Sequence, residues 1–295
     1  MPHRIDDLMA LLELERVNDL EFVGRHPETR FQRSFGGQVM AQCLEAAYRT
    51  MTDERLCHSL SGYFLRPGST DAPITYRVFS TRDGRGFSTR RVVAEQGGRE
   101  LFVMASSFKT AEAGLEHQIA PYSPPAPPER CRPLADVLAR DATTRERWLK
   151  EWGALDVRYV ESSRDNPILE NARLMVWVRT VGQLGDDPRL HQEVLAYLSD
   201  LTLLPSATVP HDVDLYSDRM QMATINHSMW FHRPIRADGW VLYDQVSPSA
   251  SNGLGFSFGR LYAGGVLGAS CAQEGLIRLL SPEDAASNHA IWVRR

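Results

Sequence analysis

A motif that occurs twice restricts the fold of this chain more than any other sequence feature. His58-Ser59 is followed by Phe64-Leu65-Arg66-Pro67, and His227-Ser228 is followed by Trp230-Phe231-His232-Arg233-Pro234, roughly 167 positions later. Two more matches follow in the same order: Gly86-Phe87-Ser88 with Gly255-Phe256-Ser257, and residues 101–108 with residues 266–273. Such ordered self-similarity is the signature of a duplicated structural unit, so we expect two similar modules in one chain.

Each half shows one helical pattern followed by strand-like runs. Phe35-Gly36-Gly37-Gln38 opens a helical stretch that reaches Tyr48, and residues 190–201 carry an apolar stripe at helical spacing that Pro205 ends. The strand-like runs are residues 74–79, 88–93, 240–243 and 256–262, with glycine-containing turns near them. One long helix and several antiparallel strands in each half predict an α+β fold and not parallel βαβ units.

Proline is concentrated between the two halves, in residues 121–128 and again at Pro133. Proline cannot continue a strand ladder or a helix, so this stretch is expected to be a connector. We therefore predict an N-terminal module at 1–116, a proline-rich linker at 117–165 and a C-terminal module at 166–295. An amphipathic piece at 137–152 lies inside the linker, and its pattern indicates no particular role.

Composition excludes several classes of protein. The chain has 295 residues, of which 24% are charged, and a formal net charge of −4, so it has no basic field that would attract nucleic acid. No apolar run is long enough to span a membrane, and the N-terminal residues carry acids where a signal peptide needs bases, so we expect a cytoplasmic protein. Cys43, Cys57, Cys131 and Cys271 are widely spaced, which predicts neither a zinc site nor a disulfide framework.

Several motifs together resemble the acyl-CoA thioesterase II family over nearly the whole chain. They are Phe35-Gly36-Gly37-Gln38-Val39, His58-Ser59, Tyr63 to Gly68, Ser199-Asp200-Leu201, Ala223 to Pro234 and Ala272-Gln273-Glu274-Gly275. The resemblance implies a double hotdog fold, in which each of two modules wraps an antiparallel β-sheet around a long helix. It also implies an acyl-CoA substrate, no metal or other cofactor, and assembly into homo-oligomers, dimers or tetramers of the double hotdog.

The resemblance further implies which residues act on the substrate. In this family an aspartate, a threonine and a glutamine orient a hydrolytic water, and the matching positions are Asp200, Thr224 and Gln273. All three lie in the second module, and the sequence match aligns Gln273 with Phe108 of the first. We therefore expect only the second module to be catalytically competent.

These residue types suit thioester hydrolysis. The leaving thiol has an unperturbed pKa near 8.5, so it needs little help from a general acid. The reaction needs a positioned water, a base for its proton and donors for the oxyanion. Asp200 is expected near a helix end, where burial and the helix dipole raise the pKa of its carboxyl group. Gln273 lies in an apolar run, where its amide needs a hydrogen-bonding partner.

Other candidate site residues follow from chemistry alone. Gly36 and Gly37 open a helix, whose free N–H groups are candidate oxyanion donors. Candidate ligands for the CoA phosphates are arginines, because the guanidinium fork matches phosphate geometry: Arg66, Arg90, Arg91, Arg233 and Arg260. Candidate residues of an acyl channel are Met229, Trp230 and Phe231.

Three alternatives remain open at this stage. Gly255-Phe256-Ser257-Phe258-Gly259 matches the nucleophile elbow of serine hydrolases, with Asp284 and His289 as the residues left for a triad, although the surrounding alternation indicates a strand. His58, His227 and His232 are candidate bases or ligands, but ordinary core histidines are the simpler interpretation. A CoA-thioester binding protein without catalysis is the third. Enoyl-CoA hydratases of related fold need a histidine five positions after the aspartate, where this chain has Pro205.

Overall fold

The computed structural model describes residues 1–122, 124–166, 169, 172–211, 213, 217 and 219–285. The helices are α1 (Ile5–Leu12), α2 (Gly36–Tyr48), α3 (Leu134–Leu138), α4 (Ala142–Trp152) and α5 (Pro188–Ser199), with short 3₁₀ turns η1 (Pro128–Arg130) and η2 (Leu204–Thr208). The first strands are β1 (Leu14–Asn18), β2 (Glu21–Gly24), β3 (Leu56–Phe64), β4 (Ile74–Asp83), β5 (Phe87–Gln96) and β6 (Arg99–Lys109). The later strands are β7 (Arg132–Pro133), β8 (Leu155–Ser162), β9 (Ala172–Thr180), β10 (Met220–Phe231), β11 (Val241–Ser251), β12 (Leu254–Ala263) and β13 (Val266–Leu279).

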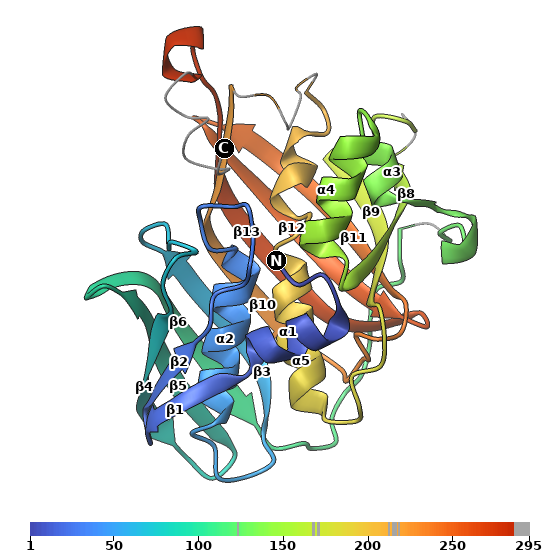
Figure 1. The fold of residues 1–295 in the computed structure, drawn as a ribbon. Coiled ribbons are helices and arrows are strands. Elements are labelled where there is room, and N and C mark those ends of the chain that lie inside the picture. Colours follow the sequence, from blue (N-terminus) through green and yellow to red (C-terminus); the bar gives the residue numbers. More distant parts are fainter. Residues whose placement is uncertain are drawn as a thin grey trace.

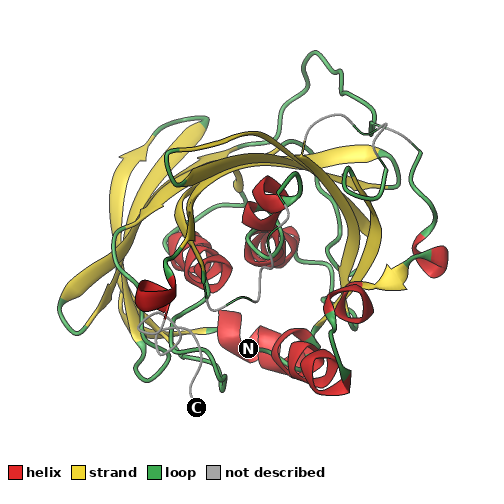
Figure 2. Cartoon of the chain, turned by 90° about the horizontal axis from the view of Figure 1, so that it is seen from above, coloured by secondary structure: helices red, strands yellow, loops and turns green. Residues whose placement is uncertain are grey.

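Within these ranges, all thirteen strands join one continuous antiparallel sheet, in the order β1-β2-β4-β5-β6-β3-β10-β13-β12-β11-β9-β8-β7. The sheet curls around the two long helices α2 and α5, which lie side by side inside it (Figures 1 and 2). The two halves of the chain meet where β3 pairs with β10. This arrangement is the predicted one: one long helix for each half, wrapped by antiparallel strands.

The two halves are related by a local twofold axis at the β3–β10 junction. Ser61 pairs with Ser228, and their hydroxyl oxygens are 2.7 Å apart, with 167 residues between them in sequence. Each of these strands carries a β-bulge at the equivalent point, at His58 in β3 and at Ile225 in β10. The duplication inferred from the sequence is therefore a duplication of structure, and its offset in this part of the sheet is 167.

The helices α2 and α5 form the centre of the core. Most side chains of α2 are buried, including Met40, Cys43 and Leu44, because one face meets the sheet and another meets α5. A helix enclosed in this way must be apolar or small around its whole circumference. Burial of these side chains and of their partners on the sheet is the main favourable contribution to folding.

The predicted linker contains more structure than a connector needs. Described residues of this stretch contact the sheet: the Tyr262 hydroxyl donates to the Ala120 carbonyl oxygen, and Trp177 donates to the Ala126 carbonyl oxygen. The same stretch then forms β7, α3, α4 and β8, and β8 pairs with β9 of the C-terminal half. The division at 117 and 165 stays a prediction, but β8 already belongs to the sheet of the second half. No helix in the described part of the chain is long and apolar enough to cross a membrane.

Candidate active site

Three polar side chains from distant parts of the sequence meet at the end of α5. Asp200 follows the last residue of that helix, Thr224 lies on β10 and Gln273 lies on β13. The Thr224 hydroxyl donates to Asp200 Oδ1 at 3.0 Å, and Gln273 Nε2 lies 2.5 Å from Asp200 Oδ1 and 2.6 Å from Thr224 Oγ1. The three residues expected from the sequence are thus in mutual contact.

The bulge at Ile225 puts Thr224 on the correct face of its strand. Buried residues of β10 alternate inward as His227, Met229 and Phe231, so a regular strand would turn position 224 outward. The extra residue reverses this alternation, and Thr224 faces the helices instead. Alternation read from the sequence does not reveal a bulge, so this feature was not predicted.

The start of α2 completes the cluster from the other half of the chain. The N–H of Gly37 donates to Asp200 Oδ2 at 2.9 Å. A Cβ atom at Gly36 would lie 2.7 Å from that same oxygen, and one at Gly37 would lie 2.2 Å from the Tyr197 carbonyl oxygen. Glycine is therefore required here for close approach, and the site is assembled between the two halves.

Burial raises the pKa of Asp200 to about 6, although hydrogen bonds from Thr224, Gln273 and Gly37 act in the opposite direction. The side chain has lost most of its contact with water, which disfavours the charged form. A carboxyl group with this pKa is ionised at neutral pH and takes up a proton more readily than an ordinary aspartate. It is suited to act as a general base.

One oxygen of Asp200 remains able to bind water. Oδ1 accepts hydrogen bonds from two side chains, whereas Oδ2 accepts, among the described residues, only the Gly37 N–H. A carboxylate oxygen has room for a second donor. Asp200 and Thr224 both line a cavity, and Gln273 is fully buried behind them. Gln273 therefore holds the other two in place.

The cavity beside Asp200 has a volume of about 1240 Å³ and is mainly apolar. Both halves and the linker contribute to its wall, through residues such as Phe35, Phe64, Trp148, Leu174 and Met222. Arginines also line it, and they come from separate segments: Arg30, Arg33, Arg66, Arg140, Arg147 and Arg164. Its size and lining suit a long apolar group attached to an anionic one.

Two family models match the chain: "Acyl-CoA thioesterase N-terminal domain" over residues 25–109 and "Acyl-CoA thioesterase" over residues 163–276. The human protein acyl-coenzyme A thioesterase 8 is 37% identical over 284 residues, covering 92% of this chain and 88% of its own. This chain belongs to the acyl-CoA thioesterase family. The resemblance drawn from its motifs and the enzyme class, thioester hydrolase, are thereby confirmed.

Solved structures agree with this assignment. The acyl-CoA thioesterase II TesB2 from Mycobacterium marinum is 40% identical to this thioesterase with a TM-score of 0.78, covering 93% of this chain and 98% of the other. A hot dog protein from Alicyclobacillus acidocaldarius shares only the fold, with 19% identity and a TM-score of 0.75, covering 94% and 99% of the two chains. The predicted double hotdog fold is confirmed.

Among the described residues, the thioesterase assembles this cluster of side chains once, although its fold is duplicated. By the twofold axis at Ser61 and Ser228, Leu60 corresponds to His227, and their partners on the next strands are Ser106 and Gln273. The counterpart of Gln273 is therefore Ser106, and the predicted match with Phe108 is wrong by two positions. Motifs match residues by type, whereas the strand pairing matches them by position in the sheet.

The other positions of the N-terminal module that correspond to site residues also lack the carboxylate and the hydroxyl of the C-terminal site. Cys57 precedes the β3 bulge as Thr224 precedes the β10 bulge, and Arg49 follows α2 as Asp200 follows α5. The counterpart of Gly37 in α5 is the second helical residue Arg189, whose N–H donates to Asp187 Oδ1 at 2.9 Å. The cavity beside Pro188 is only about 170 Å³. The second position is thus small, and the counterparts of Asp200, Thr224 and Gln273 are Arg49, Cys57 and Ser106.

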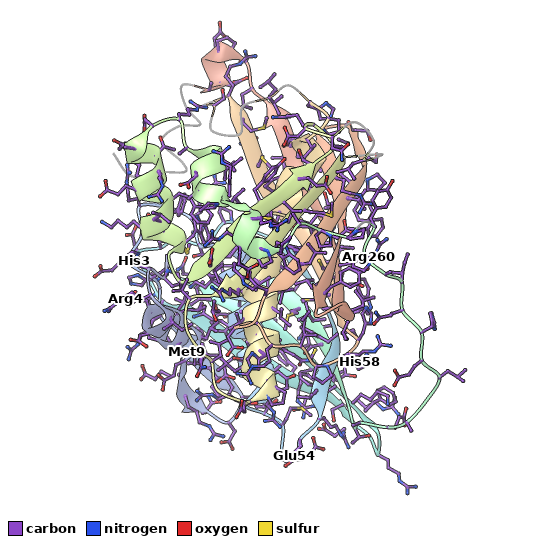
Figure 3. The ribbon with its side chains drawn as sticks, turned by 90° about the vertical axis from the view of Figure 1, so that its right-hand side faces the viewer. His3, Arg4, Met9, Glu54, His58 and Arg260 are labelled. Atoms are coloured by element: carbon purple, nitrogen blue, oxygen red, sulfur yellow. The ribbon has the colours of Figure 1, made fainter. Side chains whose placement is uncertain are left out.

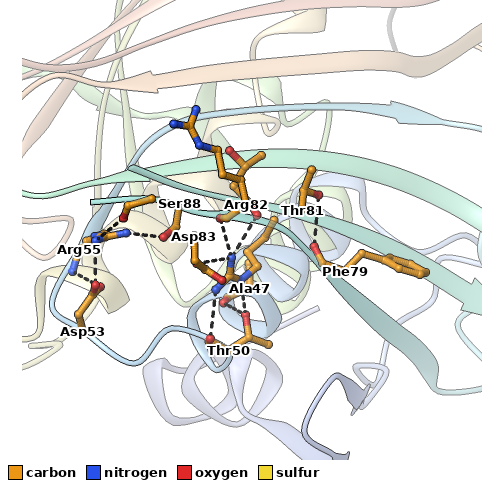
Figure 4. Close-up of polar contacts among 12 residues, drawn as sticks. Ala47, Thr50, Asp53, Arg55, Phe79, Thr81, Arg82, Asp83 and Ser88 are labelled. Atoms are coloured by element: carbon orange, nitrogen blue, oxygen red, sulfur yellow. Dashed lines mark hydrogen bonds and ion pairs between the residues drawn. The ribbon is translucent and has the colours of Figure 1, made fainter. Parts of the chain in front are cut away.

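The five arginines predicted to bind CoA lie in different places. Arg66 lines the large cavity, and Arg233 lines the small one. Arg90 is buried and bonded to Asp83 and Thr50, and both of these partners are labelled in Figure 4. The guanidinium of Arg91 lies 4.2 Å from the ring centre of Phe79. Arg260 lies 3.6 Å from Asp244 and, in Figure 3, on the opposite side of the molecule from His3 and Arg4.

The structure places the three predicted acyl-channel residues away from the cavity beside Asp200. Met229 is fully buried in the core, Trp230 is exposed on the outer face of the sheet, and Phe231 lines the small cavity. None of the three lines the cavity beside Asp200, as far as the chain is described. This part of β10 is a regular strand, so Met229 and Phe231 turn toward the helices and Trp230 turns away from them. The residues that do line it on β10 are Met222 to Ile225.

The three candidate histidines form hydrogen bonds with serines and do not line the cavity beside Asp200. His227 is fully buried with Nε2 3.1 Å from the Ser199 hydroxyl, and burial lowers its pKa to about 3. His58 and His232 are bonded to Ser107 and Ser270 respectively, and neither lines the cavity. Across the described residues, no group of histidine, cysteine, aspartate and glutamate forms a candidate metal site.

Ser257 is not at a nucleophile elbow. It lies inside β12, fully buried, 3.0 Å from the Ser206 hydroxyl, whereas an elbow requires a sharp turn between a strand and a helix. Asp284 is bonded to Ser281, and His289 lies outside the described residues. The serine hydrolase alternative therefore lacks the geometry that it needs.

Proposed function

We propose that this thioesterase hydrolyses fatty acyl-CoA, with Asp200 as the general base that activates a water molecule. The observation that carries the proposal is the position of Asp200: its carboxyl group, with a pKa of about 6, lies at the wall of a large apolar cavity. Thr224, Gln273 and Gly37 fix its orientation through hydrogen bonds. A water bound to Oδ2 then lies between the base and the cavity.

The reaction follows in two steps. Asp200 takes a proton from the water as the water oxygen attacks the thioester carbonyl carbon, which gives a tetrahedral intermediate with an oxyanion. The free N–H groups at the start of α2, near Gly36, are the proposed oxyanion donors, since a helix N-terminus stabilises negative charge. The C–S bond then breaks, the CoA thiolate leaves, and the proton on Asp200 passes to it or to solvent.

The cavity supports the choice of substrate. An acyl chain gains free energy when it leaves water for an apolar wall, by about 0.8 kcal/mol for each CH₂ group. The arginines on the wall match the phosphate groups of CoA. Of the predicted CoA ligands we retain Arg66 and add Arg30, Arg33 and Arg147. The sequence offered no signal for the last three, because their proximity depends on how the linker folds.

The test is a panel of acyl-CoA thioesters from short to long, assayed by release of free thiol. We expect hydrolysis of medium and long chains, and Asp200→Asn is expected to lower kcat by about two orders of magnitude or more. Ser257→Ala serves as the matched control and is expected to keep its activity. Intact acyl-CoA after prolonged incubation with the wild type would show a binding protein instead, and an active Asp200→Asn variant would remove Asp200 from the mechanism.

Two further proposals concern assembly and location. We propose that the chain forms a homo-oligomer through the outer face of its sheet, where Tyr63, Trp230 and Phe258 are exposed and Ser61 and Ser228 present small side chains. We also propose a cytoplasmic location, because all four cysteines are free thiols, which suits a reducing compartment.

A further inference from the structure

The linker supplies a large part of the wall of the active-site cavity. Residues of both linker helices and of the turn between them line the same cavity as Asp200: Leu134, Ala135, Val137, Leu138, Ala139, Arg140, Thr144, Arg147, Trp148, Glu151 and Trp152. Figure 1 shows α3 and α4 beside β8 and β9. A segment that served only to connect the two modules would not need to line this cavity.

Helix α4 presents one face to this cavity. Thr144, Trp148 and Glu151 are spaced by four and three positions, which places them on one side of a helix. Asp141 caps its start by accepting a hydrogen bond from the Thr144 N–H at 2.7 Å. An ion pair between Arg145 and Asp136 joins α4 to α3. The two helices therefore form one unit with a defined inner surface.

Hydrogen bonds and a ring contact attach this pair of helices to the segment that precedes Gly36 and Gly37. Glu151 is buried and accepts hydrogen bonds from the Thr29 hydroxyl at 2.6 Å and the Arg30 N–H at 3.1 Å. The ring of Trp152 meets Phe35 edge to face, with centroids 4.9 Å apart, and Phe35 immediately precedes Gly36. The α3–α4 unit is thus held in a fixed position relative to Asp200, as a specificity wall must be.

We propose that the inner surface of α3–α4 determines which acyl groups this thioesterase accepts, with Trp148 and Val137 as the specificity-determining residues. The proposal rests on the proposed hydrolysis of acyl-CoA and adds the part of the chain that selects the acyl group. Trp148 is the bulkiest inner residue of α4 outside the Trp152 anchor, and Val137 lines the same cavity from α3. The size of these two side chains limits the space left for the acyl group.

The experiment enlarges the cavity in one variant and reduces it in another. Trp148→Leu enlarges the cavity and is expected to move the optimum of kcat/KM toward longer or branched acyl-CoA. Val137→Phe reduces it and is expected to move the optimum toward shorter chains. A misplaced methylene in a fitted pocket changes kcat/KM by about tenfold or more, so the ratio between long and short substrates should change by at least that factor.

Lys150→Ala, on the exposed side of α4, is the matched control and is expected to leave the profile unchanged. Circular dichroism and the thermal midpoint show whether each variant is folded. If the wild type and all variants share one chain-length profile, the wall does not select the acyl group, although the proposed function stands. If the wild type hydrolyses no acyl-CoA, the proposed function itself fails. Opposite shifts in Trp148→Leu and Val137→Phe are the result that supports the inference.

Discussion

At the scale of single residues, Asp200 is set apart from an ordinary surface aspartate by burial. Its pKa lies near 6, whereas burial lowers that of the nearby His227 to about 3 and keeps this histidine neutral. The pKa values of His58 and His232 are lowered as well, first of all by burial. Asp200 is therefore the group at the site whose charge changes in the range where activity is measured.

This gives a prediction for the pH dependence of hydrolysis. The base must be ionised, so kcat/KM should be constant above about pH 7 and should fall as the pH decreases through about 6, approaching tenfold per unit below it. The measurement is the rate of thiol release with one acyl-CoA across this range. The residual activity of Asp200→Asn should lack the inflection, and an inflection that persists near 6 in this variant would assign it to another group.

At the scale of elements, two close approaches fix the site: α2 against the end of α5, and the bulged part of β10 beside β13. Gly37 permits the first, because any Cβ there would meet the Tyr197 carbonyl oxygen at 2.2 Å. A backbone atom cannot turn aside as a side chain can. A larger residue would force the two helices apart and withdraw the Gly37 N–H from Asp200.

We therefore predict that Gly37→Ala lowers the free energy of unfolding by about 1–3 kcal/mol, as overpacking does, and lowers kcat as well. Denaturant unfolding and thiol release measure the two effects. Gly86→Ala is the control, since the nearest atom to its added Cβ is 4.0 Å away. An active, fully stable Gly37→Ala variant would show that the helices have more freedom than their contact suggests.

The elements also show how far sequence reasoning reaches. Hydrophobic periodicity and the repeated motifs predicted two helices, antiparallel strands and a duplication, because these depend on local patterns. Motif matching could not give the strand register, since a bulge such as that at Ile225 leaves no local mark. Residue types alone match Gln273 with Phe108, whereas the strand pairing makes Ser106 its counterpart. The contribution of α3 and α4 to the cavity wall could not be predicted, because it depends on contacts between α4 and the segment 29–35.

At the scale of the whole molecule, the curved sheet leaves an outer face that the helices do not cover (Figure 2). Trp230 and Phe258 on this face are 44% and 43% exposed, and exposed apolar residues that gather on one face are typical of an interaction surface. Covering this face with a second copy would also remove its apolar area from water.

We predict that light scattering after size-exclusion chromatography gives a multiple of the mass of one chain, and that Trp230→Lys shifts the protein toward the mass of a single chain. A lysine in a buried contact brings an unpaired charge out of water, which costs several kcal/mol. Val17→Lys, at an exposed apolar residue of β1, is the control and should leave the mass unchanged. A wild type that elutes as one chain would contradict the proposed assembly.

The central claim is that Asp200 activates water and does not itself attack the acyl group, and a single turnover in H₂¹⁸O tests it most directly. With enzyme in excess over acyl-CoA, the account predicts that the released fatty acid carries one ¹⁸O atom and that the peptide containing Asp200 carries none. If the first turnover instead released unlabelled acid and placed ¹⁸O in the Asp200 carboxylate, Asp200 would be a nucleophile, and the account would be contradicted.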